Sequence, residues 1–552
     1  MDKLRRIALL GGGPAALFML KRLVETGRKD LVVDLFEQKH QLGRGMPYSN
    51  EGSGEEHVTN VSANEIPAIV TSLAEWSKTS AFNEYKDLPR LMFGQYLADQ
   101  FGLLLEMAEK TGVKVNVHFE SEVTDVAEKD GEVTVTVNHR QQSVHDIAIM
   151  CTGHHWPAPH EDKVKGYFDS PYPPAKLHLK LNHPVAIKGS SLTAVDAIRT
   201  LARQHGRFDG SGQQLSYHLN PAFGKFKIVL HALGGLLPAM RFNLNNTHLE
   251  DSRVLKPKQI AAHIAANDGF LSLDYIFEND FKKLFKNKDK EFYAHIKAMT
   301  MEEFVTDMMT MREESDPFQL LKAEYAEAER SIKRKKSVYW KELLGVLSFA
   351  MNYPAKHFSA EDMLRLQQVL LPLISVVIAY LPQSSAEELL VLHASGVLEM
   401  VAVDKDSCVE PAADGGATYT YNGETVHFKT FINCTGQPHL SFKDFPFKSL
   451  VKNKTLCPAR LRFRSGEEGE KALAADEPVK LEADGTYYLQ VPGITINDSF
   501  QVVDDSGAPN KRIYVMAVPY IGGYNPDYSG LDFCEAASEA IIKSIKWNAG
   551  KS

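Results

Sequence analysis

Cysteine is scarce in this chain of 552 residues, which has five cysteines in widely separated positions. No Cys-x-x-Cys pair occurs, which argues against a disulfide reductase that uses such a pair and against a zinc ribbon. Scattered thiols in odd number are typical of a reducing compartment, so we expect a cytoplasmic protein. The 20 histidines show no His-Glu-x-x-His or similar spacing, and the sequence therefore predicts no metal site.

Long apolar runs and excess positive charge are also lacking. The longest apolar stretch, residues 369–381, is about 13 residues long and contains Pro372, whereas a helix that spans a bilayer needs about 20. We interpret it as a buried helix, and the start of the chain has no features of a secretory signal. The 62 basic and 70 acidic residues give a net charge of −8, which argues against a nucleic-acid or membrane partner. A small-molecule substrate is the expected partner, and the oligomeric state is left open.

The N-terminal segment has the pattern of a strand, a glycine turn, a helix and a second strand. Residues 6–10 and 31–36 are short apolar runs, and residues 15–25 are apolar at helical spacing. Pro14 suits the first turn of a helix, where its missing N–H has no partner to lose. The length of the chain predicts two or three domains in all, of which this segment begins the first.

A dinucleotide-binding fingerprint, Gly11-x-Gly13-x-x-Ala16, occupies this turn, and Glu37 ends the next strand. The first glycine permits the tight turn, the second leaves room for a pyrophosphate, and the small third residue lets helix and strand pack closely. Glu37 is placed to accept hydrogen bonds from an adenosine ribose. An acid at that strand end favours FAD or NAD over NADP.

A second unit of the same kind begins near His183. Residues 185–187 are a short predicted strand, residues 192–204 a predicted helix and residues 226–232 a further strand. The segment between the last two is rich in Gly, Ser and Gln, and we interpret it as a long loop. The turn reads Gly189-x-Ser191-x-x-Ala194, with serine where the second glycine is expected.

The two units share a longer internal parallel. Strands predicted at 113–118 and 132–137 form a small antiparallel excursion that returns to a buried strand at 147–150 and stops at Cys151-Thr152-Gly153. From Gly396 a similar series leads to a buried strand and to Cys434-Thr435-Gly436. A glycine at such a strand end lets backbone approach a ligand closely.

The rest of the chain is mostly helical until it returns to the strands. Stretches 301–330 and 360–378 have apolar residues three and four apart, which predicts helices. Near the C-terminus, a buried strand is expected at 513–518, followed by a loop rich in glycine and aromatics at 519–528 and a helix at 531–546.

Several stretches resemble a bacterial FAD/NAD(P)-binding protein family whose members are largely uncharacterised and which is related to the flavin-containing monooxygenases and the amino-acid N-hydroxylases. The stretches that carry the resemblance are the N-terminal fingerprint, Gly43 to Tyr48 with Ser49, Asn60 to Ala63, Cys151 to His154, Leu192 to Ala194 and Asp527 to Leu531. The resemblance implies FAD on the first turn and a nicotinamide nucleotide, NADPH or NADH, on the second.

The fingerprint and the resemblance together name the candidate cofactor-binding residues. The reduced flavin carries negative charge near N1 and O2, so a helix that starts at residues 530–532 would stabilise it. The candidates are Gly11, Gly13, Pro14, Ala15, Ala16, Glu37, Gln38, Arg44, Gly45, Met46, Tyr48, Thr59, Asn60, Val61, Val123, Thr152, Gly153, His154, Gly189, Ser191, Leu192, Thr193, Gly530, Leu531 and Asp532.

The second turn departs from the pattern of the relatives. They commonly carry a Ser-Arg pair at the end of the next strand, suited to a 2′-phosphate, whereas this chain has Ala232-Leu233-Gly234-Gly235 and its nearest arginine is Arg241. The preference for NADPH is therefore in question, and NADH or weak nucleotide binding are the alternatives. The stretch Gly166 to Tyr172 resembles the Phe-x-Gly-x-x-x-His signature of monooxygenases only loosely. Residues 154–156 are expected either at the flavin or nicotinamide or in a turn that covers the sheet edge.

We therefore predict an α/β protein with two Rossmann-like dinucleotide-binding domains, for FAD and NAD(P), and a helical insertion. The predicted divisions are 1–160 (FAD-binding, first part), 161–250 (NAD(P)-binding-like), 251–390 (helical insertion) and 391–552 (return strands and C-terminal part of the FAD-binding domain). The predicted function is that of an FAD-dependent oxidoreductase, a NAD(P)H-dependent monooxygenase acting on a small substrate. The alternatives are a flavin reductase, oxidase or dehydrogenase, and a non-catalytic flavin- or nucleotide-binding protein. No catalytic acid or base can be named, because flavin chemistry belongs to the cofactor.

Overall fold

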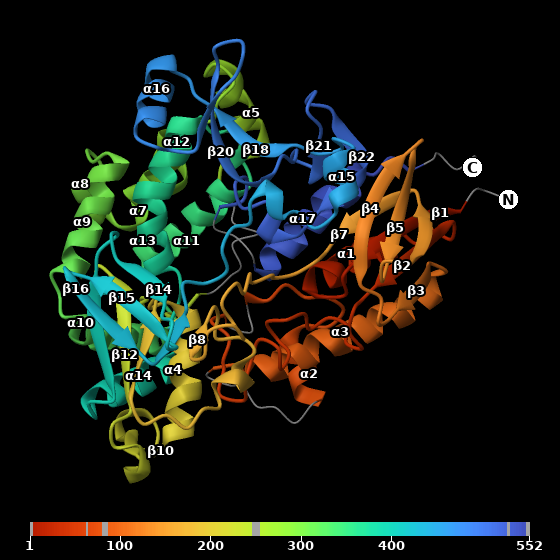
Figure 1. The fold of residues 1–552 in the computed structure, drawn as a ribbon. Coiled ribbons are helices and arrows are strands. Elements are labelled where there is room, and N and C mark those ends of the chain that lie inside the picture. The colour runs from red at the N-terminus through yellow and green to blue at the C-terminus, as the bar shows by residue number, and fades with distance from the viewer. Residues whose placement is uncertain (1–3, 62–64, 80–86, 245–253, 527–529, 548–552) are drawn as a thin grey trace.

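The computed structural model describes residues 4–61, 65–79, 87–244, 254–526 and 530–547. Two parallel sheets lie in separate parts of the molecule, with a helical region beside them (Figure 1). This arrangement confirms the predicted α/β class with two dinucleotide-binding-type units and a helical insertion. The predicted residues Ser62, Ala63 and Asp527 to Ser529 lie outside the described ranges.

The first sheet is built around the N-terminal strand, which pairs in parallel with a neighbour on each side. The next strands outward are also parallel, and the edge strand β21 is antiparallel. In sheet order the strands are β21 (Gln501–Val503), β22 (Pro509–Val515), β7 (Ile147–Met150), β1 (Arg5–Leu10), β2 (Leu31–Phe36) and β3 (Lys114–His118). Because β1, β2 and β7 are buried almost throughout, they appear in the sequence as continuous apolar runs.

Helices cover this sheet, and two of them, α1 and α17, begin where the sequence predicts. Helix α1 starts at Pro14, and the last helix of the chain packs beside it. An antiparallel ribbon projects from the same unit, between β3 and β7. The helices are α1 (Pro14–Glu25), α2 (Leu73–Thr79), α3 (Arg90–Thr111) and α17 (Leu531–Ser544), and the ribbon strands are β4 (Val123–Lys129), β5 (Glu132–Val137) and β6 (Gln141–His145).

The second sheet is parallel as well and repeats the plan of the first. Its order is β13 (Leu398–Val403), β12 (Lys227–Leu233), β9 (Pro184–Lys188), β17 (Thr430–Asn433) and β8 (Tyr167–Phe168), with α4 (Leu192–His205) after β9. Its antiparallel ribbon contains β14 (Cys408–Pro411), β15 (Ala417–Tyr421) and β16 (Glu424–Phe428). The internal repeat is thus real, with one correction. The strands at 114–118 and 398–403 belong to the parallel sheets, and each antiparallel excursion follows them.

The predicted loop between α4 and β12 is wrong in part. Strands β10 (Gly206–Asp209) and β11 (Ser216–Leu219) pair there as an antiparallel hairpin. Each strand has four residues, and the alternation of Phe208, Tyr217 and Leu219 with polar residues is too short to stand out among the Gly, Ser and Gln of this segment, which is why the sequence favoured a loop.

The helical region occupies most of the chain between β12 and β13. Apolar side chains of α6, α9, α11, α12 and α13 form one continuous core with the first sheet, whereas the second sheet has a core of its own that includes α10 and α14. The predicted helix at 369–381 is a π-turn at Leu366–Leu370 followed by α13. The helices are α5 (Pro257–Ala266), α6 (Leu273–Phe277), α7 (Lys283–Lys288), α8 (Lys290–Ile296), α9 (Met301–Glu313), α10 (Pro317–Arg334), α11 (Tyr339–Asn352), α12 (Ala360–Arg365), α13 (Leu371–Val377) and α14 (Gln383–Ala394).

The segment predicted as one C-terminal part, residues 391–552, is divided by the structure among three places. Strands β13 and β17 belong to the second sheet, and β21, β22 and α17 belong to the first unit. Between them lies a separate antiparallel sheet of β18 (Pro458–Arg462), β20 (Tyr487–Ile494) and β19 (Val479–Leu481), with α15 (Lys448–Lys452) and α16 (Gly466–Ala474) nearby in sequence. Within the described ranges, no helix combines the length and the hydropathy that crossing a bilayer requires.

Candidate functional site

The turn between β1 and α1 has a geometry that only small residues permit. Gly11 has a φ of +107°, and a Cβ on it would lie 2.9 Å from the carbonyl oxygen of Cys151. Gly13 faces Gly45, whose Cα would be 3.4 Å from a Cβ on Gly13. Pro14, Ala15 and Ala16 then open the helix, whose first turn has no side-chain cap. Uncapped N–H groups at such a turn are suited to a diphosphate.

Glu37 lies beside this turn, as predicted from the sequence. Its carboxylate accepts a hydrogen bond from the N–H of Gly12 at 2.7 Å and another from the N–H of Lys39 at 2.8 Å. Gln38, the next residue, is exposed. The contact with Gly12 fixes the carboxylate at the edge of the turn, where a ribose next to the diphosphate would meet it.

The loop after β2 packs against the turn. The N–H of Gly43 donates to the carbonyl oxygen of Gly12 at 2.7 Å, and this places Gly45 against Gly13. The guanidinium of Arg44 hydrogen-bonds the side chain of Gln95, on α3. The ring of Tyr48 packs edge-on against Phe93, with centroids 4.9 Å apart, so it contributes to the packing under the loop.

Residues 59–61 make contacts that hold the loop to the helical region. The Thr59 hydroxyl donates to the carbonyl oxygen of Val61 at 3.0 Å, and the Asn60 amide donates to that of Ala379 at 3.2 Å. The buried guanidinium of Arg241 donates to the carbonyl oxygen of Asn60 at 2.7 Å. The side chain of Asn60 is therefore engaged with the insertion, and its predicted role at the cofactor stays a prediction.

The end of β7 provides the best test of whether the site fits a cofactor. The hydroxyl oxygen of Thr152 is buried and has no hydrogen-bond partner among the described residues. A buried hydroxyl without a partner is unfavourable, and a ligand that reaches it would remove that cost. Thr152 directly follows Cys151, whose carbonyl oxygen faces Gly11. The open turn and this hydroxyl together fit a phosphate-bearing cofactor at the carboxyl edge of the sheet.

The remaining predicted residues of the first unit are spread around the sheet. Gly530 is the N-cap of α17, and Leu531 and Asp532 form its first turn. Burial raises the pKa of Asp532 to about 7, so its carboxyl group holds a proton more readily than an exposed one. Gly153 and His154 follow Thr152, and Val123 begins β4, whose ribbon is outside the parallel sheet.

The second turn repeats the hydrogen bonding of the first. The N–H of Gly11 donates to the carbonyl oxygen of Phe36 at 2.9 Å, and the N–H of Gly189 donates to that of His231 at 2.9 Å. Gly189 has a φ of +100°, and a Cβ on it would lie 2.7 Å from the carbonyl oxygen of Cys434. Phe36 and His231 therefore occupy corresponding positions in the two units.

The second turn differs from the first in its side chains. Ser191 is the N-cap of α4 with φ −81° and ψ −168°, nearly the values of Gly13, −81° and −164°. The hydroxyl of Ser190 donates to the carbonyl oxygen of Leu236 at 2.6 Å. Leu192 and Thr193 begin α4, and Thr193 lines a cavity that the first unit shares.

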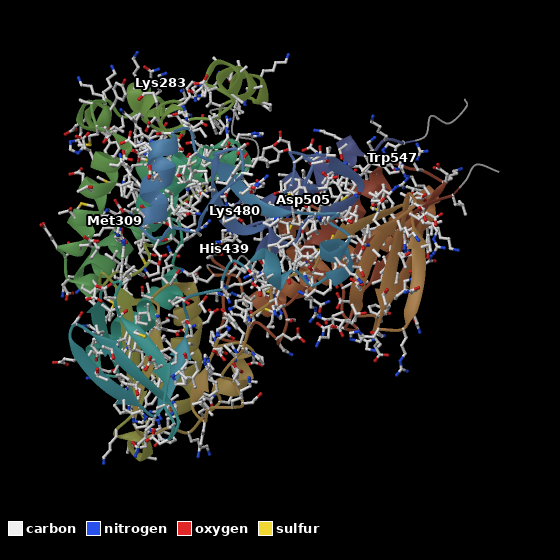
Figure 2. The ribbon with its side chains drawn as sticks, turned by 45° about the horizontal axis from the view of Figure 1, so that its top comes forward. Lys283, Met309, His439, Lys480, Asp505 and Trp547 are labelled. Atoms are coloured by element: carbon white, nitrogen blue, oxygen red, sulfur yellow. The ribbon has the colours of Figure 1, made fainter. Side chains whose placement is uncertain are left out.

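This cavity has a volume of about 360 Å³ and lies between the carboxyl ends of the two parallel sheets. In Figure 2, the labelled His439, one of its lining residues, is near the middle of the molecule. Trp156 stands between two other lining rings, with centroids 5.4 Å from His154 and 5.5 Å from Tyr172. The full lining is Met46, Pro47, Gly52, Arg90, His154, Trp156, Tyr172, Thr193, Gln437, Pro438, His439, Val518, Pro519, Asn525 and Pro526.

The two Cys-Thr-Gly turns meet at this cavity. His154 follows the first turn and Gln437 follows the second, and their side chains are hydrogen-bonded to each other. The repeat that the sequence revealed thus joins the two units across one shared space. A site between two dinucleotide-type sheets, at the carboxyl ends of their strands, is where ligands bind in open α/β proteins.

A buried ion pair fixes the two units relative to each other below the cavity. Arg90, on α3, binds both carboxylate oxygens of Asp196, on α4, at 2.5 and 3.1 Å, and donates to the carbonyl oxygen of Val58. The Tyr172 hydroxyl donates to the same carboxylate at 2.7 Å. Burial by itself would raise the pKa of Asp196, but Arg90 and His57 outweigh it and hold this pKa below the ordinary value. The carboxylate therefore stays charged and keeps the cavity wall in place.

Sequence reasoning missed several residues of the cavity. Arg90, His439 and Asn525 carry no local pattern that marks them, because they come from separate segments that meet only in the fold. Tyr172 was singled out only within a loose likeness to a monooxygenase signature. Gln437 did have a signal, since it occupies the position after Cys-Thr-Gly that His154 occupies in the first unit.

Comparisons with protein families match two parts of the chain. Residues 8–155 match the FAD-NAD(P)-binding family, and residues 256–378 match the YdhS-like middle domain. Over 559 aligned residues the chain is 27% identical to "Uncharacterized protein YdhS" of Escherichia coli strain K12, with 98% of this chain and 97% of that protein covered.

Solved structures with similar folds include amino-acid hydroxylases. The ornithine N-hydroxylase of Kutzneria sp. 744 aligns with a TM-score of 0.49 at 13% identity and 99% coverage of both chains. The L-lysine 6-monooxygenase of Pseudomonas syringae aligns at 0.43 and 13%, and the bacillithiol disulfide reductase of Bacillus cereus at 0.42 and 11%, each with 98% coverage of both chains. The chain is therefore similar to the Escherichia coli protein YdhS over nearly its whole length, and its residues 8–155 match the FAD-NAD(P)-binding family.

Proposed function

We propose that this protein is an FAD-dependent oxidoreductase that uses a nicotinamide nucleotide as reductant and acts as a monooxygenase on a small substrate. The observation that carries the proposal is the first turn, where Gly11 and Gly13 leave the backbone open beside the buried, unpartnered hydroxyl of Thr152. The match of residues 8–155 to the FAD-NAD(P)-binding family supports the choice of cofactor.

Different residues of the first unit would bind the diphosphate, the ribose and the flavin ring of the cofactor. The turn from Gly11 to Ala16 would bind the diphosphate through its backbone N–H groups, and Glu37 would accept hydrogen bonds from the ribose. The uncapped start of α17, at Gly530, would face the negative charge of the reduced ring system. When bound, FAD supplies hydride acceptance and the activation of oxygen.

The cavity next to this turn suits the substrate and the nicotinamide. Its four prolines, Pro47, Pro438, Pro519 and Pro526, restrict the backbone of the walls, and the side chains of His154 and Gln437 offer polar groups to a ligand. Met46, from the loop that packs against the first turn, and Thr193, at the start of α4 after the second turn, line the same space. A volume of about 360 Å³ is within the usual range for small-molecule sites, about 300–1,000 Å³.

Two measurements on the purified protein test this proposal. The released cofactor should be identified as FAD by mass spectrometry, and the bound flavin should lose its visible absorbance when NADH or NADPH is added without air. Substrate-dependent oxygen uptake without equivalent hydrogen peroxide would then support oxygen insertion, whereas stoichiometric peroxide indicates an oxidase. Flavin that keeps its colour with both nucleotides would contradict nucleotide-dependent turnover and leave a binding protein as the function.

A further inference from the structure

The second unit has no acidic residue at the position that Glu37 occupies in the first unit. Because Phe36 corresponds to His231 in the hydrogen bonding of the two turns, Glu37 corresponds to Ala232. The side chain at this position is a buried methyl group, which can neither accept hydrogen bonds from a ribose nor pair with a phosphate. If this unit binds a nucleotide, the polar group for the ribose must come from elsewhere in the fold.

The helical region supplies a carboxylate at that place. Glu313 is the last residue of α9, and its Oε1 lies 3.6 Å from the point where a Cβ on Gly234 would be. Gly234 follows the last residue of β12, so Glu313 reaches the end of the strand that corresponds to β2 in the first unit. With no side chain on Gly234, the carboxylate faces the strand end directly.

An exposed apolar side chain lies at the same strand end. Leu233, the last residue of β12, is 55% exposed although it belongs to a strand that is otherwise mostly buried. Its counterpart in the first unit is Gln38, two residues beyond Phe36. A lone exposed leucine is common on protein surfaces, but here it borders a turn with dinucleotide-binding geometry, where an adenine ring needs an apolar contact.

No arginine near this strand end is available for a 2′-phosphate in the described part of the chain. Arg312 pairs with Glu324 at 2.8 Å and is buried. Arg241, the arginine nearest in sequence, is buried against Asn60 and the ring of Tyr380. The charged group that the structure places against Gly234 at this strand end is the carboxylate of Glu313.

We infer that the second unit binds a nicotinamide nucleotide without a 2′-phosphate, NADH, and that Glu313 of the helical region selects it. The Glu313 carboxylate accepts hydrogen bonds from the adenosine ribose hydroxyls, and Leu233 contacts the adenine. A 2′-phosphate is disfavoured because it replaces a hydroxyl donor by a dianion next to a carboxylate. This inference rests on the proposed function, since it specifies the reductant of the same oxidoreductase.

The test is a binding measurement on the oxidised, flavin-loaded protein, which needs no turnover. Isothermal titration would compare ADP-ribose with its 2′-phosphorylated form for the wild type and for Glu313→Gln. We expect the wild type to prefer ADP-ribose, and the variant to lose at least about fivefold of that preference, the effect of one pair of unit charges about 4 Å apart in water. Glu314→Gln, one residue further along, is the matched control and should leave the preference unchanged.

A second variant tests the same strand end by gain of function. Leu233→Arg places a cation at an exposed position, where it is expected to fold normally, and it should strengthen binding of the 2′-phosphorylated ligand. Equal binding of both ligands by the wild type, or an unchanged preference in Glu313→Gln, would overturn the inference. Failure of both ligands to bind a protein that still carries FAD would also overturn it while leaving the FAD site intact. A purified protein without FAD, by contrast, would contradict the proposed function itself.

Discussion

Replacing Gly13 by serine should weaken the binding of FAD without preventing the apoprotein from folding. Gly13 has φ −81° and ψ −164°, an extended conformation that any residue adopts, and Ser191 has nearly the same values in the second turn. A Cβ on Gly13 would have its nearest neighbour, the Cα of Gly45, at 3.4 Å, which is an ordinary contact. The apoprotein should therefore fold, and a serine at the N-cap should stabilise α1 by a few tenths of a kcal/mol relative to glycine.

The same substitution should greatly weaken FAD binding. The hydroxymethyl group would take up space that the second glycine of the fingerprint leaves for the diphosphate, and for the same reason the second turn, with Ser191 there, is expected to bind its nucleotide more weakly than the first binds FAD. Losing two charge-assisted hydrogen bonds, at about 1.5 kcal/mol each, would cost about 3 kcal/mol and raise the dissociation constant roughly a hundredfold. The assay is titration of the apoprotein with FAD, followed by flavin fluorescence, together with urea unfolding of the apoprotein.

A matched control is Gly102→Ser, because Gly102 is within α3 and a Cβ there would meet no atom within 4 Å. This control should raise stability slightly, because serine favours a helix interior more than glycine does, and leave FAD binding unchanged. If Gly13→Ser instead bound FAD with the affinity of the wild type and remained folded, the turn would not hold the diphosphate, and the reasoning from its geometry would be refuted.

Three further substitutions test the site and its supports. Glu37→Gln removes the negative charge of the carboxylate that accepts a hydrogen bond from the N–H of Gly12 and would bind the ribose. Titration with FAD should then show an affinity about tenfold lower. Arg90→Met leaves the buried Asp196 carboxylate without its cation and should lower the free energy of unfolding by about 3–5 kcal/mol in urea, whereas adding Asp196→Leu should recover much of this loss. Asp532→Asn concerns pH: burial raises the folded-state pKa of Asp532 to about 7, so the wild-type apoprotein loses stability as pH rises from about 4 to 7. The variant should lack this loss and be more stable by about 4 kcal/mol at pH 8 and no more stable at pH 4; equal stability curves would contradict a buried carboxyl.

The local elements of the fold could be predicted because their signals are close together in the sequence. The turn at Gly11, the start of α1 at Pro14 and the buried strand at 31–36 each depend on backbone sterics and on contiguous apolar residues. The repeated Cys-Thr-Gly stretches predicted the strand ends at Cys151 and Cys434 for the same reason.

Elements that depend on distant partners could not be predicted in this way. The short hairpin of β10 and β11 and the antiparallel sheet of β18, β19 and β20 were not predicted as strands, because pairing between strands leaves little trace in a single sequence. The hydrogen bond from the Asn60 amide to Ala379, which lies 319 residues further along the chain, could not be predicted for the same reason.

The sequence by itself determined that two glycine turns exist, that the first is followed by an acid, and that the second departs from the pattern. Only the tertiary structure decided what surrounds them: the hydrogen bond between His154 and Gln437 across the shared cavity, and the position of Glu313 beside the bare strand end at Gly234. The physical reason is that a turn is specified by the backbone freedom of a few adjacent residues. A cavity and its charges, in contrast, are specified by packing between segments that are hundreds of residues apart.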